Sequence, residues 1–501
     1  MTVDLNNLHR LPTAPSVADR LDAGELDAEV YNTYPAPGHY DDVADRVLAD
    51  LFHTSDSVPT IRYWRNEWYR YTGTHWRPVH EDEVKKPVRA RLRQVTYIKK
   101  TQDGEEHKPW MPSKARVGEV LEPLKLTVLT AADVEAPTWT GTGRAPGQQL
   151  IAMRNGLFDP HARELHSHTA QWFNVWSLPF DYDPQAAAPR WQRFLNEVFD
   201  HDPAAADLLQ EWAGYLISGR IDLQKMLIVL GVPGAGKSVI DHVLTALMGG
   251  SVNVATPSMS DFGNRFALAQ LRGKPLAIFG DAAADAGKDQ KKVVERIKTI
   301  TGCGAVEVEP KGKDIISVQL PTRFTIIANQ TPKFLDASTA IQRRTVAMRL
   351  TKSFQDNPDK DLTTKLDDEL SGIFMWALEG LDRLNENNGK FTTPTTESEV
   401  LEGMEELGSP IRTFFKEEYS ITGEESDYIP LKEAYRNYTD WCEETGLARG
   451  RVSQNKFADD IRAMSLPGVK PGQLYMGDRV VRGITYRAGS SAGGSFFPKT
   501  R

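Results

Sequence analysis

The sequence predicts an α/β protein of several domains, with a nucleotide-binding core near the middle of the chain. Its 501 residues correspond to two to four domains at roughly 100–200 residues per domain. The apolar run 226–230 leads into a glycine-rich loop, and apolar residues at helical spacing follow over 239–247. A strand, a glycine loop and a helix in this order form the setting in which backbone N–H groups surround phosphates.

The composition narrows the class of protein. A net charge of −8 with 40% hydrophobic and 26% charged residues is ordinary for a globular protein and unlike a disordered or fibrous chain. The two cysteines, Cys303 and Cys442, are too few for a disulfide scaffold or a four-cysteine zinc site. The first residues carry no signal-peptide pattern, and the apolar run before the glycine loop is far shorter than the ~18 residues that cross a membrane. We therefore expect a cytoplasmic protein with no membrane partner.

Basic residues gather in two segments of this acidic chain. Residues 84–100 hold seven basic side chains and no acid, and residues 449–501 hold ten basic side chains and three acids. Such segments favour a nucleic-acid partner. From the sequence alone, a solvated surface explains either run equally well.

The chain before the glycine loop predicts hairpins followed by helices. Aromatic and polar residues alternate over 61–78, and an Asn155-Gly156 pair interrupts an apolar run; both patterns indicate β-hairpins. We expect the aromatic side chains to form hairpin core rather than to stack on bases. Apolar residues then recur at helical spacing over 190–218.

The glycine-rich loop supplies the main candidate site. Glycines allow backbone N–H groups to curl around nucleotide phosphates, and the following helix adds the positive end of its dipole. Lys237 is expected to reach the β- and γ-phosphates of ATP, and Ser238 to ligate Mg²⁺. The predicted nucleotide-binding residues are Gly231, Val232, Pro233, Gly234, Ala235, Gly236, Lys237 and Ser238.

Two strand ends are predicted to complete this site. Asp281 ends the apolar run 276–280, where a carboxylate suits the Mg²⁺ shell. Asn329 ends the apolar strand 323–328, and nucleotide sites of open α/β sheets lie beyond the carboxyl ends of strands. Its amide is therefore expected to approach the γ-phosphate or the attacking water. The alternative is an asparagine that only begins a turn.

Arg343 and Arg344 follow the second of these strands and lead into a further apolar run. An arginine at this place can reach the γ-phosphate of a neighbouring subunit and stabilise transition-state charge. Ordinary surface salt bridges are an equal alternative. The sequence does not choose between the two arginines.

A β-hairpin is predicted between Asp281 and Asn329. The charged segment 288–300 reads as a helix, and apolar residues then alternate with polar ones on both sides of a turn that bears Lys311 and Lys313. A turn tipped with lysines is suited to contact phosphates. An ordinary exposed basic turn is the alternative.

Taken together, these motifs resemble those of superfamily 3 helicases, the AAA+-related ring motors of viral, phage and plasmid replication proteins. Within that superfamily the chain is similar to the phage/plasmid and poxvirus-type primase–helicases, over roughly residues 60–487. The resemblance implies an α/β P-loop NTPase (AAA+-like) motor core, preceded by an α+β N-terminal domain and followed by a helical linker and a winged-helix domain. The expected parts are a flexible lead-in (1–58), the N-terminal α+β/helical domain (59–204), the ATPase domain (205–352), an acidic helical linker (353–425), the winged-helix DNA-binding domain (426–488) and a flexible tail (489–501).

The same resemblance implies an ATP-dependent replicative DNA helicase of a phage, prophage or plasmid, acting in the bacterial host cytoplasm. Such motors form rings, usually hexamers, that translocate 3′→5′ on single-stranded DNA and meet forked DNA. By this resemblance one arginine of the pair acts in trans. The residues implied to act in cis are Lys237, Asp281 and Asn329, and those implied to contact DNA are Lys298, Lys311 and Lys313.

Two departures from the family pattern shape the prediction. Ala282 follows Asp281 where related motors often carry a second acid, so the water-activating base stays open, with Asp285 as one candidate. The chain before the glycine loop has no zinc-knuckle cysteines and no polymerase-like pair of aspartates. We therefore expect a helicase that works with a separate primase or replication initiator. A primase–helicase with unrecognised priming activity and a DNA-packaging or partitioning ATPase are the alternatives.

Overall fold

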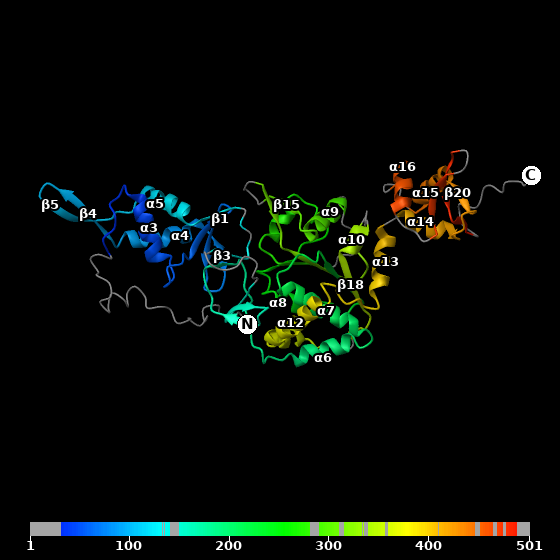
Figure 1. Cartoon of the computed structure of the whole chain (residues 1–501), viewed down its shortest axis with the longest axis horizontal. Helices are drawn as coiled ribbons and strands as arrows, with labels where there is room; N and C mark the ends of the chain where they lie inside the picture. The colour runs from blue at the N-terminus through cyan, green and yellow to red at the C-terminus, as the bar shows by residue number, and fades with distance from the viewer. Residues whose placement is uncertain are drawn as a thin grey trace, which may run out of the picture. The chain divides into compact units, whose positions relative to one another are not determined.

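The chain divides into two compact units, which we call the first unit (1–184) and the second unit (185–501). The computed structural model describes residues 32–132, 134, 136–140, 150–280, 290–309, 315–332, 334, 339–355, 359–408, 410–445, 451–463, 468–473 and 477–487. Figure 1 shows the elements of both units, each of which has its own hydrophobic core.

In its described residues, the first unit combines helices with small sheets that are antiparallel apart from the parallel pairing of β1 with β6. Its helices are α3 (Tyr40–Leu51), α4 (Glu81–Leu92) and α5 (Lys114–Thr127). Its strands are β1 (Ile61–Trp64), β2 (Glu67–Tyr71), β3 (Trp76–Val79), β4 (Thr96–Thr101), β5 (Gly104–Pro109), β6 (Leu129–Thr130), β7 (Thr138–Trp139), β8 (Ile151–Met153), β9 (Gly156–Asp159), β10 (Glu164–His166) and β11 (Trp172–Phe173). They form sheets in the orders β3-β2-β1-β6, β10-β9-β8, β11-β7 and β4-β5.

The aromatic hairpin predicted over 61–78 is confirmed as core. Strands β1, β2 and β3 pair in antiparallel register. Trp64 and Trp76 are buried, and the ring of Phe173 meets both at centroid distances of 5.1 Å and 5.8 Å. Edge-to-face contacts of this kind stabilise a core beyond the area that they bury. The hairpin predicted at Asn155-Gly156 is present as β8 and β9.

The flexible lead-in expected over 1–58 is wrong for its described part. Helix α3 buries Val43, Ala44, Val47 and Leu48 against α4 and α5. This spacing places the four side chains on one face of a helix, so the face is driven into the core. The prolines and glycines at 35–38 precede the helix and do not interrupt it.

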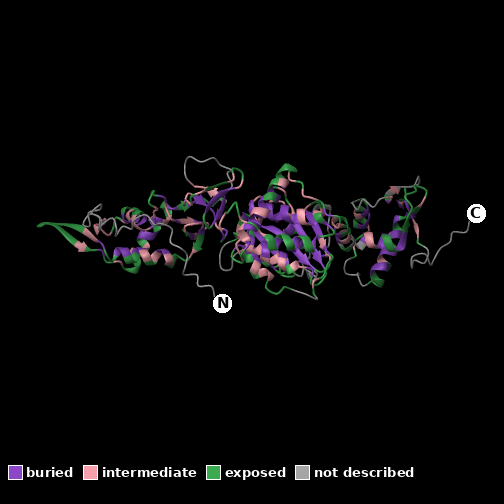
Figure 2. Ribbon diagram, turned by 90° about the horizontal axis from the view of Figure 1, so that it is seen from below, coloured by how far each residue is buried: buried purple, intermediate pink, exposed green. Residues whose placement is uncertain are grey.

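The second unit is built on a five-stranded parallel sheet in the order β13-β14-β17-β12-β18. Its strands are β12 (Met226–Gly231), β13 (Val254–Ala255), β14 (Leu276–Gly280), β17 (Arg323–Ala328) and β18 (Thr345–Leu350). Every residue of β12 and β17 is buried, as expected for a parallel sheet covered on both faces. Buried residues gather accordingly around this sheet in Figure 2.

Helices cover the sheet and a hairpin extends from it. The helices before the C-terminal segment are α6 (Pro189–Val198), α7 (Pro203–Ile217), α8 (Lys237–Leu247), η1 (Ala267–Leu271), α9 (Gln290–Thr301), α10 (Thr339–Arg343), α11 (Leu362–Asp367), α12 (Leu370–Glu386) and α13 (Glu397–Gly408). The predicted hairpin is present as β15 (Ala305–Val308) and β16 (Ile316–Gln319), paired antiparallel. Thus α6, which lies within the expected N-terminal domain (59–204), belongs to the second unit together with α7.

The segment 353–425, expected as a linker, supplies a helix to the core of the second unit. Helix α12 lies so close to α7 that side chains are excluded between them. A Cβ on Gly380 would lie 2.2 Å from the carbonyl oxygen of Gln210, and a Cβ on Gly214 would lie 2.5 Å from the backbone nitrogen of Leu381. The buried carboxylate of Glu211 fastens the pair, because it accepts from the Arg383 guanidinium at 2.9 Å. Glu379 and Asp382 of α12 are exposed, whereas Glu369, just before the helix, is buried and accepts from the backbone N–H groups of Arg190 and Trp191.

The C-terminal segment folds around its own apolar cluster. Its elements are α14 (Pro410–Glu418), β19 (Tyr419–Ile421), β20 (Tyr428–Pro430), α15 (Leu431–Glu444), α16 (Gln454–Ala463), β21 (Lys470–Gln473), β22 (Arg479–Arg482) and β23 (Ile484–Tyr486). Strands β20, β22 and β21 form one antiparallel sheet, and β19 pairs with β23. The cluster includes Phe414 and Phe415, which precede the boundary expected at residue 426. No helix in the described ranges has the length and apolar character to span a membrane.

Candidate active site

The glycine loop connects β12 to α8 through two residues in the left-handed backbone region. Gly234 has φ +74° and Gly236 has φ +89°, conformations that a side chain would strain. Gly236 is the N-cap of α8, and no side chain caps that helix end. The positive end of the helix dipole therefore faces the loop, which suits an anion.

Lys237 folds over this loop. Its Nζ donates to the carbonyl oxygens of Gly231 at 2.7 Å and Val232 at 2.8 Å. Ser238 follows in the first turn of α8 and is exposed. The ammonium group thus lies against the loop that is predicted to bind phosphates, and the exposed Ser238, the predicted metal ligand, follows it directly. Within the described ranges, no group of three His, Cys, Asp or Glu side chains could hold a metal ion.

A segment after β18, residues 351–355, packs against the loop and was missed by sequence reasoning. The Phe354 N–H donates to the carbonyl of Gly234 at 3.0 Å, and Ser353 Oγ donates to the carbonyl of Pro233 at 2.9 Å. A Cβ on Gly234 would meet Gln355, so the approach requires glycine. We call 351–355 the strap. It has no periodic or glycine-rich pattern that would have announced it.

The strap is also fixed to the turn after α6. Lys352 Nζ lies 3.0 Å from Asp200 Oδ2, and Thr351 Oγ1 lies 2.7 Å from His201 Nε2. Hydrogen bonds from His201 and Lys352 lower the pKa of Asp200. On the other side of the loop, a Cβ on Gly236 would lie 2.9 Å from the Phe194 ring. The loop is therefore held between α6 and the strap.

Asn329 lies beside the loop at what we call the carboxyl edge of the sheet, where the strands end. Leu230 of β12 pairs with Ala328 of β17, so the residues that follow, Gly231 and Asn329, emerge side by side. Asn329 is exposed there. Gly280, the last described residue of β14, pairs with Ile327 at the same edge. Asp281 and Asp285, the predicted magnesium ligand and candidate base, lie outside the described residues.

Arg343 and Arg344 lie at the opposite, amino edge of the sheet, where the strands begin. The Met226 N–H donates to the carbonyl of Arg344 at 2.7 Å, and Met226 begins β12 whereas the glycine loop follows its end. Six residues of strand separate the two edges by roughly 17 Å. The arginines are therefore remote from the glycine loop of their own chain.

The two arginines differ in environment. Arg343 is exposed, whereas Arg344 is half-buried. The Arg344 guanidinium turns toward the carboxyl end of α9, where a Cβ on Gly302 would lie 3.1 Å from Nη2. The sequence offered no means of separating these neighbours, but in the structure only Arg343 of the two is exposed.

The predicted DNA contacts are only partly visible. Lys298 lies on α9 and is half-buried. Lys311 and Lys313 belong to the hairpin tip and lie outside the described residues. The described base of the hairpin is tied to α9, because Gln319 Nε2 donates to the carbonyl of Cys303 at 2.9 Å.

Two family models match the chain. Residues 47–200 match the model described as "D5 N terminal like", and residues 229–344 match a family of unknown function, DUF5906. The second match begins in β12 and ends at Arg344, so it spans both edges of the sheet.

Comparison with individual proteins gives more distant likenesses. "Putative helicase 184R" of Invertebrate iridescent virus 6 is 22% identical over 352 residues, which cover 62% of this chain and 36% of the viral protein. The chain thus spans about a third of that relative's length. The apo structure of the C-terminal region of NrS-1 has a TM-score of 0.48 at 12% identity, covering 85% of this chain and 96% of that one. The A form apo structure of the same region gives a TM-score of 0.47 at 10% identity, covering 85% of this chain and 97% of that one. The chain is thus similar to a D5 N-terminal-like family model over residues 47–200 and to a viral protein named as a putative helicase.

Proposed function

We propose that this chain is the ATP-hydrolysing motor of a replicative DNA helicase, and that its catalytic site is completed only between two copies of the chain. One observation carries the proposal. The glycine loop and Asn329 share one edge of a parallel sheet, while the exposed Arg343 lies at the other edge, roughly 17 Å away.

The carboxyl edge supplies the nucleotide half of the site. The loop 231–238 would surround the phosphates of ATP, with Lys237 on the β- and γ-phosphates. Mg²⁺ would be held by Ser238 and Asp281 and would neutralise charge on the phosphates. Asn329 would orient the attacking water or the γ-phosphate. The left-handed glycines and the uncapped start of α8 support this fit.

The amino edge supplies the other half to a neighbouring copy. An arginine that stabilises transition-state charge must reach the γ-phosphate, and Arg343 is too far from the loop of its own chain. Its exposure favours it over Arg344, which is turned toward α9. Repeating this contact from copy to copy generates a closed ring if the rotation closes, which supports a homo-oligomer. The hexamer proposed as its size comes from the family resemblance.

The DNA contacts complete the proposal. Lys298, Lys311 and Lys313 would bind phosphates of single-stranded DNA in the ring, and the C-terminal segment 426–488 would bind forked DNA as a winged helix. Translocation 3′→5′ and a separate primase or initiator belong to the proposal. So does replication of a phage, prophage or plasmid in a bacterial cytoplasm.

ATP hydrolysis measured with and without single-stranded DNA tests the function. We expect magnesium-dependent hydrolysis that single-stranded DNA stimulates, and displacement of a duplex strand on substrates with a 3′ tail but not a 5′ tail. A Lys237→Ala preparation purified in parallel controls for contaminating ATPases. An ATPase rate that single-stranded DNA does not change and that only long duplex DNA stimulates would favour a packaging or partitioning ATPase instead.

A further inference from the structure

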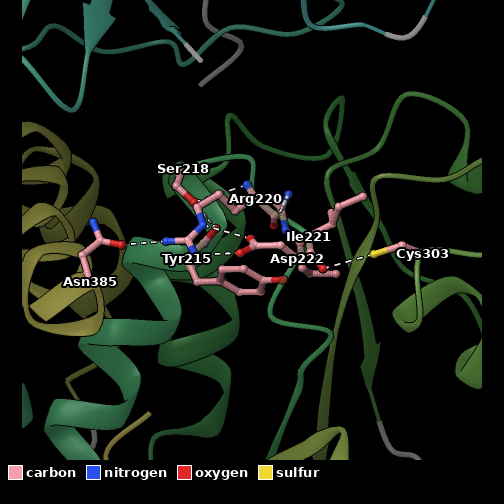
Figure 3. Close-up of polar contacts among 8 residues, drawn as sticks. Tyr215, Ser218, Arg220, Ile221, Asp222, Cys303 and Asn385 are labelled. Atoms are coloured by element: carbon pink, nitrogen blue, oxygen red, sulfur yellow. Dashed lines mark hydrogen bonds and ion pairs between the residues drawn. The ribbon is translucent and has the colours of Figure 1, made fainter. Parts of the chain in front are cut away.

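The connection between α7 and β12, residues 218–225, joins several segments at the amino edge of the sheet. Figure 3 shows Arg220 at its centre. The Arg220 guanidinium donates to both carboxylate oxygens of Asp222 at 2.9 Å and 2.8 Å, and to Asn385 Oδ1 at 2.6 Å. Since Asn385 lies in the last turn of α12, this network fastens the connection to that helix.

The first strand residue of β17 holds the start of the connection. Arg323 is buried, and its guanidinium donates to the carbonyls of Leu216 at 2.6 Å and Arg220 at 3.4 Å. Burial lowers the pKa of Arg323 to about 10, so the group stays charged at neutral pH. The connection is thus anchored before it reaches the two segments that matter for the proposed function.

One of these segments is the base of the β15–β16 hairpin. The Cys303 thiol donates to the carbonyl of Ile221 at 3.2 Å, as drawn in Figure 3. Cys303 lies two residues before β15, and its own carbonyl accepts from Gln319 of β16. A displacement of the hairpin base therefore acts on the connection directly.

The other segment is the end of α10, which carries Arg343. Lys225 Nζ donates to the carbonyl of Arg343 at 2.6 Å. Lys225 is half-buried; burial lowers its pKa, and the carboxylate of Glu397 opposes that shift. An ammonium on the last carbonyl of a helix fixes where the helix ends. It therefore also sets the point from which the Arg343 side chain extends.

We propose that Lys225 is a positioning residue for Arg343, and that the connection 218–225 links Arg343 to the base of the β15–β16 hairpin. The proposal rests on the proposed function, because it gives Arg343 a reaction to serve. Its physical content is separate: the Lys225 ammonium of this connection holds the end of α10, and the Ile221 carbonyl of the same connection accepts from the thiol at the hairpin base.

Lys225→Met tests the first contact, since it removes the ammonium and keeps most of the stem. We expect the kcat for ATP to fall by about 10- to 100-fold, the effect of a small misplacement of a catalytic group. The KM for ATP should be unchanged, because the nucleotide loop lies at the other edge. Lys225→Arg keeps a charged donor and should restore most of the rate. Mixing Lys225→Met chains with Lys237→Ala chains should restore ATPase, because the latter supply a well-placed Arg343.

Lys274→Met is the matched control. Lys274 also donates from Nζ to a backbone carbonyl, that of Ser251 at 2.9 Å, and burial also lowers its pKa. It touches neither arginine nor hairpin in any described contact, so its ATPase should match wild type. A normal kcat in Lys225→Met would overturn the positioning role, as would a loss of equal size in Lys274→Met.

The second contact is tested with Cys303→Ala against Cys303→Ser, which retains a donor. We expect Cys303→Ala to lower the stimulation of ATPase by single-stranded DNA about two- to fivefold, the size of one modest hydrogen bond, with the basal rate unchanged. Cys303→Ser should retain the stimulation. Equal stimulation in both variants would show that the hairpin base and Arg343 are not linked through this connection.

Hydrogen exchange separates failure of this proposal from failure of the proposed function. Lys225→Met should raise exchange over 339–345 and 303–308 but leave 231–247 unchanged. If exchange responds in this way and wild-type protein hydrolyses no ATP, the link stands and the helicase function fails. If exchange over 339–345 is unchanged, Lys225 does not position Arg343, whatever the ATPase.

Discussion

The two edges of the central sheet handle charge in opposite ways. At the carboxyl edge, Gly234 and Gly236 keep side chains away from the loop, and the uncapped start of α8 presents a positive dipole end. At the amino edge, helices finish and present carbonyl groups, and cations cover them. Arg323 covers the end of α7, Lys225 the end of α10, and Arg344 turns toward the end of α9.

This difference follows from the architecture. Helices that connect parallel strands run back across the sheet, so helix starts gather where strands end and helix ends gather where strands begin. One edge is therefore ready for an anion, and the other needs cations for stability alone. At the amino edge, Arg323 and Lys225 are accordingly engaged with backbone carbonyls. Arg343 stands apart because its side chain is exposed.

The largest effect on ATP hydrolysis is expected from substitution of Arg343, and it should distinguish Arg343 from Arg344. Arg343→Ala should lower kcat by about 10³- to 10⁵-fold, as for other arginines supplied in trans, with ATP binding preserved. Arg344→Ala should instead lower the melting temperature and affect kcat less. Steady-state ATPase, nucleotide affinity and thermal unfolding of both variants decide the matter. The reverse pattern would exchange their roles.

Mixing experiments then show whether the arginine acts in trans. Arg343→Ala chains and Lys237→Ala chains should each be nearly inactive, while a mixture should regain part of the activity, since some interfaces combine an intact Lys237 with an intact Arg343. If the mixture is as inactive as its parents under conditions where subunits exchange, Arg343 acts within its own chain or has a structural role.

At the carboxyl edge, Lys237→Ala should lower ATP hydrolysis by roughly 10²- to 10³-fold or more, because one charged donor to the phosphates is lost. The fold should survive, since the ammonium donates to two loop carbonyls, those of Gly231 and Val232. Circular dichroism and thermal unfolding check the fold. Wild-type turnover in this variant would show that the glycine loop is not the nucleotide-binding site.

Substitutions at the centre of the sheet should lower the stability of the fold without changing the kcat for ATP. Trp212 Nε1 of α7 donates to Thr325 Oγ1 of β17 at 3.0 Å, and both side chains are fully buried. Thr325→Val leaves that N–H without its acceptor and should lower the free energy of unfolding by about 1–3 kcal/mol. Adding Trp212→Phe removes the orphaned donor, so the double variant should lose less than the two single losses summed. A change in kcat here would contradict the division between edges and centre.

Acidification should destabilise the first unit more than the second, and we expect this effect to be the smallest of those described. Burial lowers the pKa of His53, His75 and His168, all in the first unit. Below about pH 6.5 the unfolded chain binds these protons while the folded unit resists them, so the first unit loses stability as pH falls. Arg323, with a pKa of about 10, keeps its charge throughout. We expect the change from pH 7.5 to pH 5.5 to weaken hydrogen-exchange protection, corrected for intrinsic rates, more over 61–79 than over 323–328. His75→Gln should reduce this difference.

Local patterns allowed much of this molecule to be predicted. The glycine loop, the aromatic hairpin and the β15–β16 hairpin depend on residues close together in sequence, and all three are present. Features that depend on distant partners were not predictable. The strap carries no pattern of its own, α12 looked like an acidic linker, and α3 was hidden among prolines and glycines. Whether Arg343 or Arg344 is exposed depends on α9, some forty residues earlier.

The hydrogen bonds between Asp202 and Thr395 bring together two parts of the chain that are far apart in sequence. Asp202, just before α7, accepts hydrogen bonds from the N–H and hydroxyl of Thr395 at 3.1 Å and 2.8 Å, so the chain returns to its starting point after 193 residues. A segment whose two ends meet can be spliced into a host sequence, or reopened elsewhere and rejoined, with little strain on its interior. Residues 202–395 therefore begin and end at one place, and the flanking helices α6 and α13 complete the packing around the loop and the sheet.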